Sequence, residues 1–94
     1  MSLPLTYYST MSTEELLDEK TRLETRLSGL EDVTEKVAKS AEANIELMAF
    51  EEKLTDDTVN RMRFITALYY SKQLEMDRIR DRIEMVDYFL KQQQ

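Results

Sequence analysis

The stretch "ALYYSKQLEMDRIRDRIEMVDYFL", residues 67–90, decides the fold, because its apolar residues recur at alternating steps of three and four. Extended back to Met62, the series holds nine positions, and all except Lys72 are apolar. The strict alternation of apolar and polar residues that is typical of a β-strand does not occur in this stretch. A 3.5-residue repeat sustained over four heptads is typical of helices that pair in a left-handed coiled coil. The stretch therefore predicts a helix that packs along another helix.

The same stretch holds three arginines and one lysine, so a helix that binds nucleic acid is the alternative. Acidic residues stand three or four positions from the basic ones, as in Glu75–Arg78, Asp77–Arg80, Arg80–Glu84 and Asp87–Lys91. Such spacings place opposite charges side by side on a helix surface. A nucleic-acid helix would leave its arginines concentrated and unpaired, so we interpret this surface as a solvated, ion-paired face.

A second apolar series precedes the first, with seven apolar positions among ten. Ser12 or Thr13 can act as the N-cap of this helix, and Glu15 stands three residues after Ser12, at the spacing of a capping box, in which each side chain bonds the other residue's backbone N–H. The ten positions are Leu16, Lys20, Leu23, Leu27, Leu30, Thr34, Val37, Ala41, Asn44 and Met48. The spacing predicts one long helix over about 12–53. A kink or a break at Gly29, the only glycine, is the alternative.

Residues 54–57 mark the expected turn, since Thr55, Asp56 and Asp57 are favoured at helix starts. A second helix should follow over about 58–92, and residues 1–11, which contain the only proline, should form an irregular arm. A short connection makes the two helices antiparallel neighbours. The predicted fold is an all-α, coiled-coil-like helical hairpin, a single domain over 12–94, in which residues whose numbers sum to about 111 face each other.

Composition bears on stability and on partners. A chain of 94 residues buries a modest core, and without cysteine or histidine it has neither disulfides nor the usual zinc ligands to add stability. Apolar residues beside the series, such as Leu68, Leu74 and Phe64, widen the apolar surface beyond a two-stranded seam. We therefore expect two hairpins to complete a four-helix bundle as a homodimer. The net charge of −6 disfavours a nucleic-acid partner.

The sequence lacks the residues that several kinds of catalysis and ligand binding require. No histidine or cysteine is present for nucleophilic or imidazole acid–base catalysis, and one glycine cannot form a phosphate-binding loop. We expect no catalytic, cofactor or metal site, no membrane association, and a cytoplasmic location, which the absence of cysteine fits. The length and long first helix resemble those of small all-helical chorismate mutases, but "DDTVNRMRF" (56–64) lacks the adjacent Arg–Glu pair of those enzymes.

The predicted function is non-enzymatic protein–protein interaction or assembly through helix packing, with a second copy and another protein as partners. A helical enzyme with an intersubunit site, or a regulator that contacts nucleic acid through its arginine face, remains the alternative. Candidate partner contacts are the aromatic residues Tyr70, Tyr88 and Phe89. The predicted interaction seam comprises Leu23, Leu27, Leu30, Val37, Ala41, Met48, Met62, Ile65, Tyr69, Met76, Ile79, Ile83, Val86 and Leu90.

Overall fold

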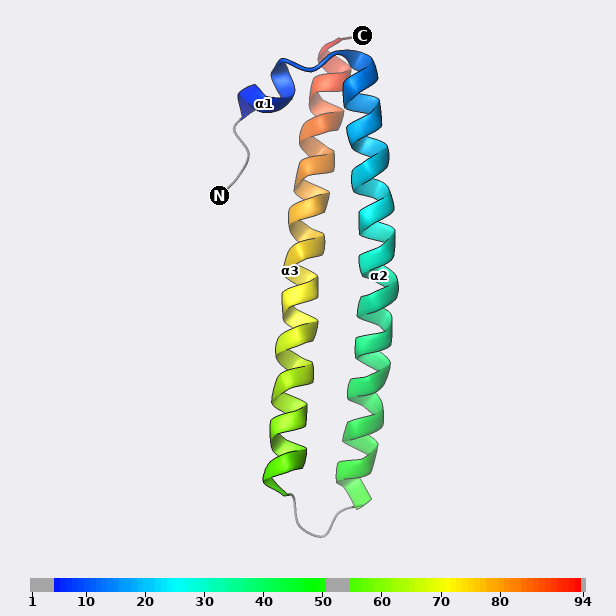
Figure 1. Cartoon of the computed structure of the whole chain (residues 1–94), viewed down its shortest axis with the longest axis vertical. Helices are drawn as coiled ribbons and strands as arrows, with labels where there is room; N and C mark the ends of the chain where they lie inside the picture. The colour runs from blue at the N-terminus through cyan, green and yellow to red at the C-terminus, as the bar shows by residue number, and fades with distance from the viewer. Residues whose placement is uncertain (1–4, 51–54, 94) are drawn as a thin grey trace.

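The computed structural model describes residues 5–50 and 55–93, which form three helices: α1 (Leu5–Ser9), α2 (Thr13–Phe50) and α3 (Asp56–Gln92). The two long helices pack side by side and antiparallel, and α1 lies beside the end where α2 begins and α3 finishes (Figure 1). No strand occurs in these ranges. The predicted all-α hairpin is confirmed.

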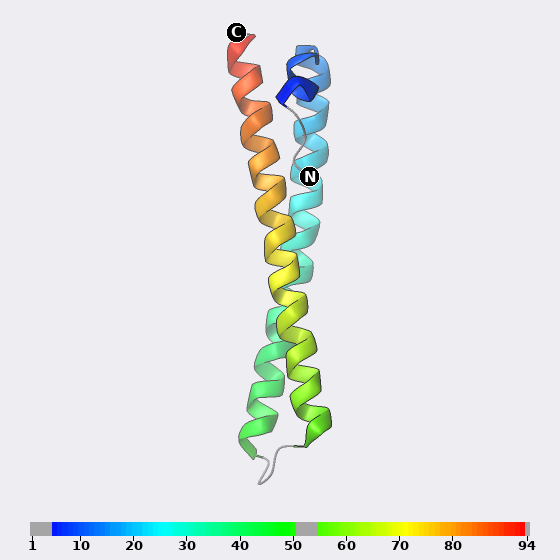
Figure 2. The ribbon, with the colours of Figure 1, turned by 90° about the vertical axis from the view of Figure 1, so that its left-hand side faces the viewer.

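The two long helices wind around each other in a left-handed sense, as their crossing in Figure 2 shows. This is the geometry that a 3.5-residue repeat imposes on helices of about 3.6 residues per turn. Lys20 contacts Asp87 across the hairpin, and the Thr34 hydroxyl lies 3.9 Å from the Met76 sulfur. Opposing residue numbers therefore add up to about 107–110, close to the expected register.

The start of α2 is a complete capping box. The Glu15 backbone N–H donates to Ser12 Oγ over 3.1 Å, and the Ser12 N–H donates to Glu15 Oε1 over 3.2 Å. Ser12 is thus the N-cap, and the helix begins at Thr13. The predicted end of this helix at about residue 53 lies outside the described residues, as does residue 54 of the predicted turn.

Helix α3 starts two residues earlier than the spacing predicted. The Thr58 N–H donates to Thr55 Oγ1 over 3.2 Å, so Thr55 is the N-cap and the helix begins at Asp56. Asp56 and Asp57 then occupy the first turn, where their carboxylates lie near the positive end of the helix dipole. Thr55, Asp56 and Asp57 can each cap a helix, and the apolar spacing did not indicate which of the three does so.

Gly29 neither ends nor interrupts α2, which is helical on both sides of it. Its φ is not positive, and a Cβ built there would meet nothing within 4 Å. The alternative of a break at Gly29 is therefore wrong. The heptad phase passes through this residue, and the packing of the neighbouring turns offsets the propensity cost of about 1 kcal/mol for an interior glycine.

The core is concentrated at the end of the hairpin opposite the turn. Its fully buried members include Tyr8, which lies in α1, together with Leu16 and Leu23 of α2 and Val86 of α3. The arm, which was expected to be irregular, therefore contains a short helix over Leu5–Ser9. The reason is local packing: Tyr8 is wholly buried against both long helices, and this burial orders the turn that carries it.

Side chains also close this end of the hairpin. Gln93 Nε2 donates to the Met11 carbonyl over 2.9 Å, and the Thr13 hydroxyl donates to the Gln93 side-chain oxygen. One glutamine after the last turn of α3 thus holds the segment that joins α1 to α2. These bonds fix where the arm leaves the hairpin.

Replacing Gly29 by alanine is expected to raise the free energy of unfolding by about 0.5–1 kcal/mol, because the site is helical and has room for a Cβ. Urea unfolding followed by circular dichroism measures the change. As a control, Ser28→Gly at the neighbouring exposed position should lower the stability by about 0.5 kcal/mol. A destabilised Gly29→Ala variant would show that the glycine is needed for a bend.

Candidate interaction surface

Exposed apolar side chains gather near the turn. We define the turn half of the hairpin as residues 33–50 of α2 and 55–74 of α3. Seven of the ten exposed large hydrophobic residues among the described side chains lie there. Phe50 is 87% exposed, and Phe64 and Tyr70 are each 68% exposed. The other four are Val33, Ile45, Leu47 and Leu74.

The turn half has little core of its own. Among its described apolar residues only Ile65 is buried, and the other seam residues, such as Met48 and Met62, are half-buried. Two helices bury one stripe each against the other, and the residues beside those stripes stay in water unless a further element covers them. In the opposite half α1 covers one side, and in the turn half no described element does so.

Helix α1 identifies one side of the hairpin, which we call the arm face. It lies over Glu19 and Arg22 of α2, which line a hollow together with Tyr7 and Met11. On α3, Met85 and Phe89 pack against the core cluster that holds Tyr8. Residues spaced by seven return to the same side of a coiled-coil helix. The arm face therefore continues into the turn half through the residues Val33, Lys36, Ser40, Ala43, Leu47 and Phe50 of α2, and Arg61, Phe64, Leu68 and Ser71 of α3.

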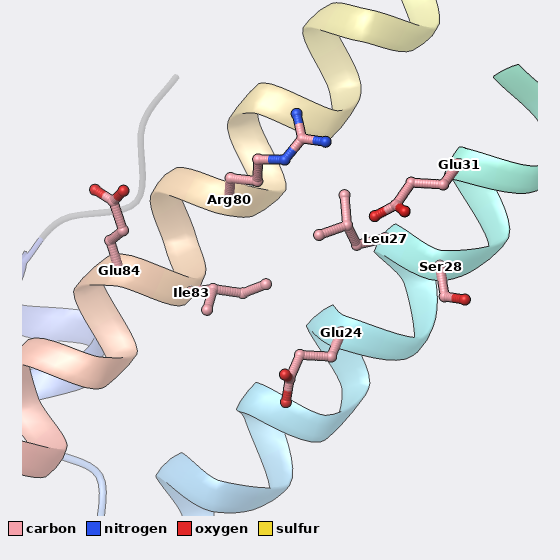
Figure 3. A pocket seen from close by; sticks show the side chains of 7 residues that line it. All are labelled: Glu24, Leu27, Ser28, Glu31, Arg80, Ile83 and Glu84. Atoms are coloured by element: carbon pink, nitrogen blue, oxygen red, sulfur yellow. The ribbon is translucent and has the colours of Figure 1, made fainter.

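The opposite side, which we call the groove face, carries three open hollows in line. Figure 3 shows the middle one, where Leu27 of α2 and Ile83 of α3 extend toward each other. Around this apolar floor stand Glu24, Glu31 and Glu84, together with Arg80 (Figure 3). The hollow toward the end of the hairpin opposite the turn, which we call the open end, includes the Lys20–Asp87 ion pair at 2.7 Å. The third hollow is lined by Met48, Val59, Met62, Arg63, Thr66 and Ala67.

Ion pairs follow the sequence spacing only in part. Of the four pairs expected on α3, the structure contains Asp77–Arg80, at 3.3 Å. Asp87 instead pairs with Lys20 across the hairpin, and the Asp87 carboxylate raises the pKa of the Lys20 ammonium. Glu75 pairs with Lys72 at 3.9 Å. Sequence spacing identifies candidates within one helix and cannot include partners on the other helix.

The predicted seam residues occupy the inner sides of the two helices. Ile65, Met76, Ile79, Val86 and Leu90 are buried on α3, as is Leu23 on α2. The remaining seam residues, which are Leu27, Leu30, Val37, Ala41, Met48, Met62, Tyr69 and Ile83, are half-buried. Among the polar seam positions, Asn44 donates to the carbonyl of Ser40 on its own helix over 2.8 Å.

The three candidate partner contacts lie in different surroundings. Tyr70 is exposed in the turn half, whereas Tyr88 is exposed near the open end. Phe89 is half-buried and packs on the core cluster beside α1, so it contributes to the intramolecular core. The predicted contacts did not include Val33, Leu47, Phe50 and Phe64, because the position of α1 in the structure, and not the sequence, identifies the arm face on which they lie.

Within the described residues no group of three or more acidic side chains is placed to hold a metal ion. None of the described helices is both long and apolar enough to cross a membrane. Comparison with family models, curated proteins and solved structures finds no match for this chain. Inferences about function therefore depend on the chemistry of its own surfaces.

Tyr8→Phe is expected to raise the free energy of unfolding by about 1 kcal/mol, because the Tyr8 hydroxyl is buried and has no hydrogen-bond partner. Tyr8→Ala, which also removes the ring from the core, should lower it by about 3 kcal/mol. Urea unfolding measures both changes. The control Tyr7→Ala, at a half-exposed ring, should change stability by less than about 1 kcal/mol. A loss of stability in Tyr8→Phe would show that the hydroxyl has a partner.

The arm should also leave the hairpin at alkaline pH. Burial, and then the nearby Glu19 carboxylate, raise the pKa of the Tyr8 phenol above its ordinary value of 10.0. Because the folded-state pKa is the higher one, the stabilisation by Tyr8 is complete below pH 10 and is lost as the pH rises through the raised value. Tyrosinate absorbance should show one late-titrating phenol that is absent from Tyr8→Phe, and identical titrations of the two proteins would contradict this.

Proposed function

We propose that this chain is a non-enzymatic module for protein–protein interaction or assembly, which acts through helix packing and self-associates. The observation that carries the proposal is the unequal distribution of core. Around Tyr8 three helices share a buried cluster, whereas the turn half leaves aromatic and aliphatic side chains in water. Large exposed apolar patches on small proteins usually mark interaction sites.

The partner on the turn half is another helical surface. A third and a fourth helix laid along a hairpin would cover the side chains beside the seam and complete a bundle. A second copy offers two such helices, so the homodimer with four helices is the assembly we favour. The remaining surfaces of that dimer would then be available to another protein, as expected of an adaptor or a structural component in the cytoplasm.

The surfaces of the described residues suit this role better than catalysis. The three hollows of the groove face are open to solvent, and their floors are made by aliphatic side chains such as Leu27 and Ile83. A catalytic site needs an enclosed pocket in which polar groups converge. The absence of histidine and cysteine from the sequence supports the same interpretation.

Light scattering after size exclusion tests the proposal. The molar mass of the unmodified chain should rise from 11.2 kDa toward twice that value between micromolar and near-millimolar concentration. Phe64→Glu, which places a charge in the exposed patch, should hold the mass at 11.2 kDa. The matched control Tyr88→Glu, at an exposed ring near the open end, should behave like the unmodified chain.

Circular dichroism would establish that both variants remain helical. A mass of 11.2 kDa for the unmodified chain at every concentration would disprove self-association.

A further inference from the structure

The turn half has two sides on which a second copy could pack, and both carry exposed apolar residues. On the groove face, seven-residue steps from Glu24, Arg63 and Ala67 reach Ile45, Tyr70 and Leu74. Those from Ser28 reach the acidic residues Glu35 and Glu42, so two copies that met through this face would bring these carboxylates together. Like charges held close in an interface oppose association.

The arm face of the turn half carries four of the seven exposed large apolar residues, which are Val33, Leu47, Phe50 and Phe64, beside the basic residues Lys36 and Arg61. Along α2 it presents Val33, Lys36, Ser40, Ala43, Leu47 and Phe50 at alternating steps of three and four. This is a second seam with large side chains at its ends and small ones at its centre. Along α3 the same face presents Phe64 and Leu68, and Ser71 is again the small residue. Small side chains at the middle of such a seam let two helices approach closely.

We propose that a second copy of this chain packs antiparallel against the arm face of the turn half, an inference that rests on the self-association proposed above. A two-fold axis would cross α2 between Ser40 and Ala43, and α3 between Leu68 and Ser71. In this arrangement α2 lies against α2 of the second copy, and residues whose numbers sum to 83 face each other. Val33 then meets Phe50 of the second copy, and Lys36 meets Leu47 of the second copy.

Two features of the hairpin select this register. Helix α1 covers the arm face as far as Arg22, so the second copy can use only the part of that face beyond the arm. A shift of one heptad toward the turn would leave the half-exposed Val33 without an apolar neighbour. A shift of one heptad the other way would bring the turn of the second copy toward α1. The register in which facing residue numbers sum to 83 covers the part of the arm face that lies between α1 and the turn.

The covered area agrees with a reversible dimer. Residues 33–50 span about 27 Å of helix, and two packed helices are about 20 Å wide. Their product gives roughly 550 Å² for each copy and roughly 1,100 Å² in total, which is near the lower bound of stable specific interfaces. The same estimate for the shorter register, which overlaps over 40–50 only, gives roughly 700 Å² in total, less than such an interface needs.

Disulfide trapping tests this arrangement, because the native chain has no cysteine. Lys36→Cys and Leu47→Cys are made in separate chains and then mixed under mild oxidation. The antiparallel register places these two positions at the same level, so the mixture should form a disulfide-linked dimer. Each variant alone should not, because identical positions would be about 16 Å apart along the bundle.

The control pair is Glu35→Cys and Ile45→Cys, both exposed and on the groove face, which should not cross-link. Efficient cross-linking of Lys36→Cys with itself would show a parallel dimer, and cross-linking of the control pair would move the interface to the groove face. Either result overturns this inference and leaves self-association intact. A chain that stays monomeric in light scattering removes both proposals.

Discussion

Two helices alone cannot cover the apolar surface that this sequence gives them, and the rest of the structure depends on that constraint. Each long helix buries one stripe against the other, while residues beside the stripe, such as Phe64 and Leu47, remain in water. Near the open end the chain meets the constraint with its own third element, because Tyr8 brings α1 into contact with both helices. The turn half has no described counterpart, and this difference between the halves locates the surface on which the proposed function depends.

Helix α1 is short, yet its position has two consequences. It supplies the wholly buried ring of Tyr8, whose apolar contacts stabilise the core. The Tyr8 hydroxyl group has no hydrogen-bond partner, which offsets part of that stabilisation. It also occupies one end of the arm face and thereby limits where another helix can lie. The bonds from Gln93 to Met11 and Thr13 hold it at this end. An assembly that uses the arm face is thus restricted to the turn half by the chain's own arm.

The hairpin itself could be predicted because its causes are local and periodic. The 3.5-residue repeat indicated the helices and their inner sides, and Ser12 with Glu15 indicated the first N-cap, which forms as a capping box. The burial of Tyr8 could not be predicted, since it depends on how an arm of eleven residues folds back on the hairpin. The ion pair of Lys20 with Asp87 joins the two helices, and the repeat on either one does not specify it. Exposed residues such as Val33 carry no separate signal until α1 shows which side of the hairpin accepts another element.

The size of the uncovered surface bears on the kind of assembly this chain can form. An interface at the lower bound of stable complexes gives an affinity set by a few well-packed side chains, rather than a permanent dimer whose subunits cannot fold apart. The hairpin already buries a cluster of its own, so a folded monomer and a dimer can both exist. The groove face, with Glu24, Glu31 and Glu84 around an apolar floor, would face outward in that dimer. Association through the arm face would therefore leave both groove faces exposed for contact with other proteins.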